Sequence, residues 1–185
     1  SRAVSRSLPH PLNRPQSPLS LPQHVCVCVN VCIQVYASAA PVLHDCQIDG
    51  NRSAGVAVST MAAPHLLRCK LSGNGAGISM VDGGQGVYTD CTLSANGTVQ
   101  VEVAECKGKS EAPQLIRCTV EAGKGCGVVI RGEGACVLVD CQVRRHALMG
   151  LVVAGSAATL SMQGGVVEAN QTGGLYLSEL ARVSC

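Results

Sequence analysis

Large aromatic side chains are almost absent from this sequence, which has no Trp, no Phe and three Tyr among 185 residues. A core made without such rings is built from aliphatic side chains and thiols, and suits a narrow cylinder. The same scarcity removes the stacking surfaces that single-stranded nucleic-acid binders use, and a net charge of +2 leaves no basic stripe. No apolar run reaches the roughly 18 residues of a membrane span. We therefore expect neither a nucleic-acid nor a membrane partner.

A repeat is present instead. The intervals between successive repeat positions, taken from the residue numbers, are 23, 22, 27, 23, 23 and 21. Such a period indicates one supersecondary unit used several times. The repeated residue is cysteine, except that Gly164 occupies the position between the last two cysteines. The cysteines of the repeat are Cys46, Cys69, Cys91, Cys118, Cys141 and Cys185.

A second strand follows each cysteine segment. It begins after a turn rich in Gly and Asn and continues with aliphatic residues, as in Gly77–Met80 and Gly127–Ile130. We expect two strands per repeat, stacked in parallel on the next turn. With the cysteines, the expected inward columns are Ile48, Leu71, Leu93, Val120, Val143 and Val166, then Val56, Ile78, Val99, Val128, Leu151 and Leu175, then Val58, Met80, Val101, Ile130, Val153 and Leu177.

These features predict an all-β protein, a right-handed single-stranded parallel β-helix solenoid of about six rungs of 22–23 residues. The motif of turn Asn, Gly-aliphatic strand and Cys-centred strand resembles the repeats of the right-handed β-helix superfamily. That superfamily includes pectate lyases and the repeat domains of certain F-box proteins and Shc-binding proteins. The resemblance covers about residues 41–185 and implies the fold, while both enzymes and non-catalytic scaffolds share it.

The first 40 residues have a different composition. Residues 1–24 hold five of the eight prolines and are expected to be disordered. In the segment 25–40, residues 25–35 alternate Val or Ile with Cys, Asn or Gln, which predicts either an N-terminal capping strand or an artefact of a gene model. Residues 41–185 are expected to form the β-helix repeats. Because the chain starts at Ser1 and stops inside a repeat, we expect a piece of a longer solenoid. A soft-metal site is a weaker hypothesis for one face of this strand, with the ligands His24, Cys26, Cys28 and Cys32.

The residue before each repeat cysteine is expected to point outward. The charges of these residues alternate between negative and positive from one repeat to the next. One interpretation is a lyase-like groove, in which Asp90 and Asp140 bind calcium and Arg117 is the base. The favoured interpretation is an exposed ladder of salt bridges, with no cofactor. The column reads Asp45, Arg68, Asp90, Arg117, Asp140 and Gln163.

One insertion lengthens a repeat and contains Cys106, Lys107 and Lys109, which join the charged column as candidate interaction residues. Stacked in-register cysteines cannot easily bridge, so reduced thiols and a cytoplasmic or nuclear location are expected. The leading hypothesis for function is a non-catalytic scaffold for protein partners, of the kind that recognises substrates in F-box-type ubiquitin ligases. The alternative is a carbohydrate-active β-helix enzyme or polysaccharide-binding protein.

Overall fold

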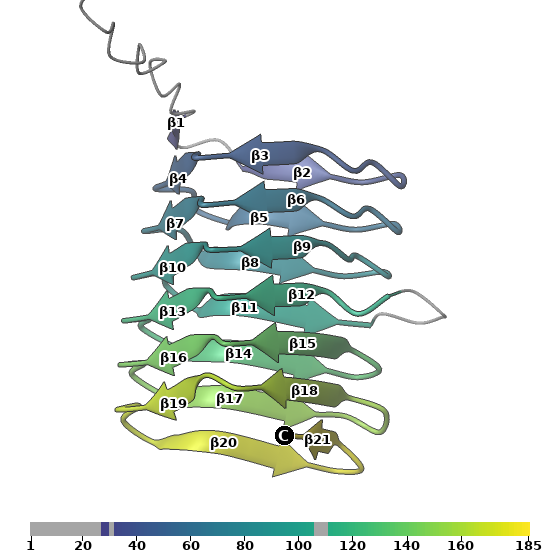
Figure 1. The fold of residues 1–185 in the computed structure, drawn as a ribbon, viewed down its shortest axis with the longest axis vertical. Coiled ribbons are helices and arrows are strands. Elements are labelled where there is room, and N and C mark those ends of the chain that lie inside the picture. Colours follow the sequence, from purple (N-terminus) through teal and green to yellow (C-terminus); the bar gives the residue numbers. More distant parts are fainter. Residues whose placement is uncertain (1–26, 30–31, 106–110) are drawn as a thin grey trace, which may run out of the picture.

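The computed structural model describes residues 27–29, 32–105 and 111–185. Within these ranges no residue is helical, and the chain coils into a solenoid of parallel strands (Figure 1). The strands form three sheets along the coil, here called A, B and C, each with seven strands. Seven strands of one sheet are joined by six turns of the chain, so the expected all-β parallel solenoid of about six rungs is confirmed.

Each sheet takes one strand from every turn. Sheet A contains β1 (Val27–Val29), β4 (Gln47–Asp49), β7 (Lys70–Ser72), β10 (Thr92–Ser94), β13 (Thr119–Glu121), β16 (Gln142–Arg144) and β19 (Val166–Glu168). Sheet B contains β2 (Ile33–Val35), β5 (Ala54–Val58), β8 (Ala76–Met80), β11 (Val99–Ala104), β14 (Cys126–Arg131), β17 (Met149–Ala154) and β20 (Gly173–Ser178). Sheet C contains β3 (Val42–His44), β6 (His65–Leu67), β9 (Val87–Thr89), β12 (Gln114–Ile116), β15 (Ala135–Val139), β18 (Thr159–Gln163) and β21 (Arg182–Ser184).

Three strands per turn replace the expected two, because the cysteine segment bends. In one turn, β6 ends at Leu67 and β7 begins at Lys70. Of the two residues between them, Arg68 has a φ of 53°, and its four counterparts in other turns have φ of 50° to 55°. Left-handed backbone costs a residue with a side chain about 1–2 kcal/mol. No glycine marks these corners, so the sequence pattern did not reveal them.

The cysteine column lies in the core as expected, since Cys46, Cys69, Cys91, Cys118 and Cys141 are each at most 4% exposed. The aliphatic residues two positions later, from Ile48 to Val143, are fully buried. Sheet C adds an inward column that was not predicted. Its buried members are Leu66, Tyr88, Leu115 and Leu138.

One turn of sheet B corrects the expected register by two residues. Val99 and Val101 had been placed in the two aliphatic columns, but Val101 and Val103 occupy them. The cause is Gln100, which stands where the turn before has Gly77, so no glycine marks the start of the strand. The pairs that fix the register are Val101 with Ile78 and Val128, and Val103 with Met80 and Ile130.

A second correction concerns the turn that contains Gly164 and Gly165. Val167 pairs with Val143, so Val166 is not in the inward column and is 48% exposed. Gly165, rather than Gly164, therefore takes the cysteine position. A Cβ there would overlap the carbonyl oxygen of Cys141, which explains why a glycine is required.

The same register moves the outward column. Gly164, and not Gln163, stands next to Asp140 in that column, because Gln142 pairs with Val166 two residues further on. Cys185 also lies elsewhere than expected. Ser184 pairs with Ser161, which places Cys185 three residues before the cysteine position of its turn.

The strand expected over residues 25–40 is two short strands in two different sheets. β1 pairs with β4 in sheet A, and β2 pairs with β5 in sheet B. They add strands to the coil ahead of residue 41. The proline-rich residues 1–24 lie outside the described part of the chain.

Candidate functional site

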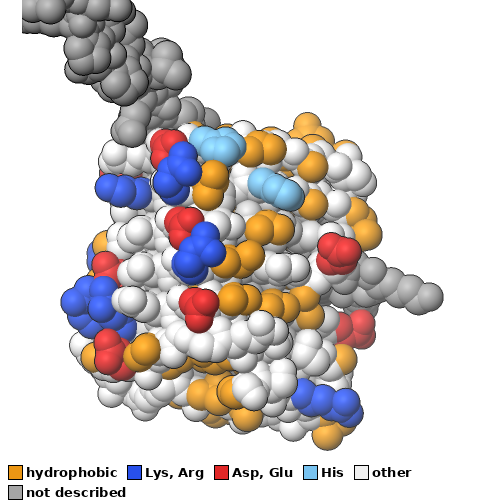
Figure 2. Space-filling model, in the orientation of Figure 1, with side chains coloured by type: hydrophobic (Ala, Val, Ile, Leu, Met, Phe, Trp, Pro, Cys, Tyr) orange, Lys and Arg blue, Asp and Glu red, His pale blue; other side chains and the backbone are white. Residues whose placement is uncertain are grey.

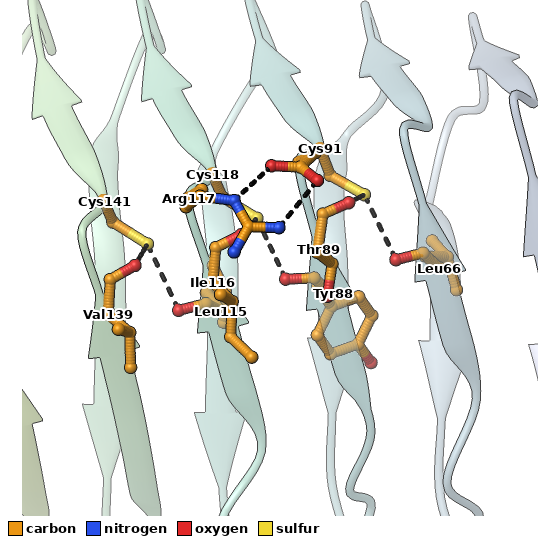
Figure 3. Close-up of polar contacts among 11 residues, drawn as sticks. Leu66, Tyr88, Thr89, Cys91, Leu115, Ile116, Arg117, Cys118, Val139 and Cys141 are labelled. Atoms are coloured by element: carbon orange, nitrogen blue, oxygen red, sulfur yellow. Dashed lines mark hydrogen bonds and ion pairs between the residues drawn. The ribbon is translucent and has the colours of Figure 1, made fainter.

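The outward residues Asp45, Arg68, Asp90, Arg117 and Asp140 form a charged column along the edge between sheets C and A (Figure 2). Two pairs within it are bidentate. Arg68 donates from Nε and Nη2 to the two carboxylate oxygens of Asp45, with both distances 2.7 Å. Arg117 does the same to Asp90, at 2.7 and 2.8 Å, as Figure 3 shows. The expected salt bridges between neighbouring turns are therefore present at these two places.

The pairing sets the charge state of this column. The Arg68 guanidinium hydrogen-bonds the carboxylate of Asp45 and lowers its pKa, and Arg117 lowers the pKa of Asp90 in the same way. The carboxylates in turn raise the pKa of both arginines. A guanidinium held in this way is a poor proton acceptor, so Arg117 is not arranged as the base of a lyase-like reaction.

Asp90 and Asp140, the candidate calcium ligands, are separated by the turn that carries Arg117. Two strand spacings place their backbones roughly 9.6 Å apart. Calcium holds oxygens at about 2.3–2.6 Å, so ligands of one ion lie within about 5 Å of each other. The geometry thus argues against one ion shared by these two carboxylates.

The thiols of the cysteine column donate inward to backbone carbonyl groups. Cys118 Sγ lies 3.1 Å from the carbonyl oxygen of Tyr88, and Cys141 Sγ lies 3.3 Å from that of Leu115 (Figure 3). The neighbouring thiols of Cys141 and Cys91, together with burial, raise the pKa of the Cys118 thiol. Because it is buried and donates to a backbone carbonyl, the Cys118 thiol is placed as a structural group.

A ladder of buried amide side chains runs along the coil through the segments that connect the strands of sheet A to those of sheet B. Asn51 donates from its backbone nitrogen and from Nδ2 to Oδ1 of Asn74, at 3.0 and 2.7 Å. Asn74 repeats the pattern with Oδ1 of Asn96, at 2.9 and 3.1 Å. Nδ2 of Asn74 also donates to the carbonyl oxygen of Ile48, and Nδ2 of Asn96 to that of Leu71, both in the preceding turn. We call this set, continued by His146 and Asn170, the amide ladder.

Gly123 interrupts the amide ladder, and the side chain of Gln100 fills the space. Asn96 donates from Nδ2 to Oε1 of Gln100. A Cβ at Gly123 would overlap Gln100 Nε2 and would lie 2.8 Å from His146 Nδ1. Gln100 is fully buried, and its Nε2 has no hydrogen-bond partner among the described residues. Gln100 stands at a position that is glycine in the turn before. Its side chain thus fills the space in the amide ladder that Gly123, in the next turn, leaves empty.

His146 is buried and held as a neutral ring. Its Nδ1 accepts from the backbone nitrogen of Gly123 at 3.2 Å, so Nε2 carries the proton and donates to the carbonyl oxygen of Val120 at 3.1 Å. Burial lowers the pKa of His146, against smaller opposing effects of Val120 and Glu121. Both nitrogens are engaged, so this histidine is not available for proton transfer to a bound molecule.

The soft-metal candidates are only partly described. His24 and Cys26 lie outside the described residues, Cys28 belongs to β1 of sheet A, and Cys32 directly precedes β2 of sheet B. Burial raises the pKa of the Cys32 thiol. Within ranges 27–29, 32–105 and 111–185, no three His, Cys, Asp or Glu residues are placed to hold a metal ion. Cys106, Lys107 and Lys109 also lie outside the described residues.

The outer surface of sheet C, here called the sheet C face, is more apolar than the sequence suggested. Its half-buried aliphatic side chains stand beside the charged column, and Figure 2 shows this strip of hydrophobic side chains. A depression of about 400 Å³ opens at its C-terminal end, with Val137, Leu160 and Ser161 in its wall. The aliphatic residues are Leu67, Val87, Ile116, Val137 and Val139.

Comparison with protein families gives one match. The family model for the right handed beta helix region matches residues 24–167, which is well over half of the chain. Neither the curated proteins nor the solved structures contain a match to this sequence. In the described part of the chain, no helix has the length and apolar character needed to cross a membrane.

Proposed function

The chain belongs to the right-handed β-helix family, and we propose that it is a non-catalytic scaffold that binds protein partners on its outer surface. The observation that supports this proposal is the sheet C face. Half-buried aliphatic side chains on successive turns, next to a charged column, form a long surface of the mixed apolar and polar kind that proteins bind.

The engagement of the reactive side chains also supports a scaffold. Asp45 and Asp90 are tied to arginines, and His146 is held by backbone groups at both ring nitrogens. The column thiols donate to carbonyl groups in the core. Each of these groups contributes to the coil, so among the described residues the exposed sheet surfaces are the part that we propose meets a ligand.

The finer proposal is that the partners are proteins selected for ubiquitination and that this chain is the substrate-recognition part of an F-box-type ligase. Its support is the resemblance of the repeats to those of F-box proteins. A reducing compartment, the cytoplasm or nucleus, is proposed with it, because buried thiols in one column are compatible with the reduced state.

Photo-crosslinking from two matched positions on one turn tests the scaffold. A photoreactive amino acid at Val137 faces out from sheet C, and the same amino acid at the exposed Gln142 faces out from sheet A. We expect specific proteins to be captured from position 137 and not from 142, and Val139→Glu to abolish the capture. Equal capture from both positions, or capture of polysaccharide in place of protein, would favour the carbohydrate-active alternative.

A further inference from the structure

The charged column repeats a two-residue unit, and its last unit in the described chain is incomplete. An aspartate on one turn receives an arginine from the next in Asp45–Arg68 and in Asp90–Arg117. Asp140 is the third such aspartate. The residue at the arginine position of its next turn is Gly164, which has no side chain to donate.

The backbone at this position matches the two complete units. Gly164 has a φ of 67°, while Arg68 and Arg117 have φ of 53° and 51°. A Cβ at Gly164 would overlap Oδ1 of Asp140, so the carboxylate leans over the site from which an arginine side chain would start. No described residue donates a hydrogen bond to this carboxylate, although its charge does act on Arg117. The corner thus has the shape and charge of an arginine site without the arginine.

An apolar surface adjoins the unpaired carboxylate. Val139 directly precedes Asp140 and faces out of sheet C, and Val137 lies two residues further back in the wall of the 400 Å³ depression. Side chains two residues apart on a strand are about 6.6–6.8 Å apart on the same face. An extended segment with an arginine and an aliphatic residue at that spacing would cover both features.

We propose that Asp140 and Gly164 form a docking site for an arginine of a protein partner, with an aliphatic residue of the same segment on Val137 and Val139. This inference rests on the proposed scaffold function and names the chemistry of its partner. The guanidinium would take the bidentate position that Arg68 and Arg117 take on their own aspartates. Bidentate arginine–carboxylate pairs are charge-assisted and more specific in geometry than a single contact.

The test uses the full chain and a capped peptide, arginine-threonine-valine-threonine, followed by chemical shifts of the valine methyl groups. The matched control peptide carries citrulline, which keeps the shape and removes the charge. We expect the arginine peptide to bind roughly two- to fivefold more tightly, the range of an exposed ion pair with good geometry. The preference should disappear in Asp140→Asn and in Gly164→Arg, whose own guanidinium would fill the site. It should persist in Glu168→Gln, which removes an exposed carboxylate elsewhere on that turn.

Equal binding of the two peptides to the unmodified chain would overturn the inference, and so would a preference that survives in Asp140→Asn. Failure of the inference and failure of the scaffold are separable. A protein captured from position 137 that binds Asp140→Asn as tightly as the unmodified chain would remove the arginine site and leave the scaffold standing. Absence of capture on the sheet C face would count against the scaffold itself.

Discussion

The side chain of Gln100 fills the space that Gly123 leaves in the amide ladder. This compensation allows a double-mutant cycle that tests the register of the coil. From β5 onward, the other turns have glycine at the first position, as at Gly77, and an amide or imidazole at the second, as at Asn96. Gln100→Gly and Gly123→Asn together would restore both positions to the common pattern. Each change alone would leave the ladder with either a gap or an excess of atoms.

The single variants should both be destabilised, for different reasons. Gln100→Gly leaves Nδ2 of Asn96 without the acceptor Oε1, which costs about 1–3 kcal/mol for a buried unpaired donor. The glycine adds about 0.5–1 kcal/mol through backbone entropy. Gly123→Asn places a Cβ against Gln100 Nε2 and 2.8 Å from His146 Nδ1, and such overpacking costs about 1–3 kcal/mol.

The double variant should regain most of this loss. Asn at position 123 can accept from Asn96 and donate to Nδ1 of His146, as each amide of the ladder does with its neighbours. We expect its free energy of unfolding, from urea titrations, to lie within about 1 kcal/mol of the unmodified protein, with a coupling energy of about 2–3 kcal/mol. Single effects that add to within about 0.5 kcal/mol would refute the proposed compensation.

Three further predictions use the core. Because burial lowers the pKa of His146, the unfolded chain binds the extra proton first, so stability should fall as pH drops below about 6.5, and His146→Asn should remove this dependence between pH 7 and 5 in urea titrations. A thiol reagent should label exposed Cys185 in the native protein but Cys69, Cys91, Cys118 and Cys141 only after unfolding; rapid native labelling of these four would contradict their burial. Val128→Asp should cost several kcal/mol because it buries an unpaired charge, whereas Val137→Asp on the sheet C face should be mild; equal shifts in Tm would reverse the inward and outward assignment.

The sequence predicted the coil because its signal is local and repeated. Each cysteine carries the same short pattern of neighbours, and each buried strand follows a turn with glycine or asparagine. Such signals recur at a fixed stride, so Cys69 and Leu71 could be assigned to the core from their neighbours alone. Their burial in the structure agrees with that assignment.

The remaining features depend on pairs of residues that meet only when turns stack. The corner at Arg68 has no glycine, so the third sheet was not predicted from composition. Gln100 fills a space that Gly123 leaves, although the two residues are 23 positions apart and follow different local patterns. The lack of an arginine opposite Asp140 likewise depends on the register of the next turn. Because Gly164 and Gly165 are adjacent, the sequence did not show which of them takes the position beside Asp140.

The claim that the charged column holds the coil in register, and does not perform chemistry, has one direct test. The purified chain is incubated with polygalacturonate and related uronate polymers, with and without millimolar calcium, and unsaturated products and Tm are measured. We predict no product, no rise in Tm with calcium, and a loss of about 1 kcal/mol or less for Arg117→Gln. Product formation that requires calcium and disappears in Arg117→Gln and Asp90→Asn would contradict the account.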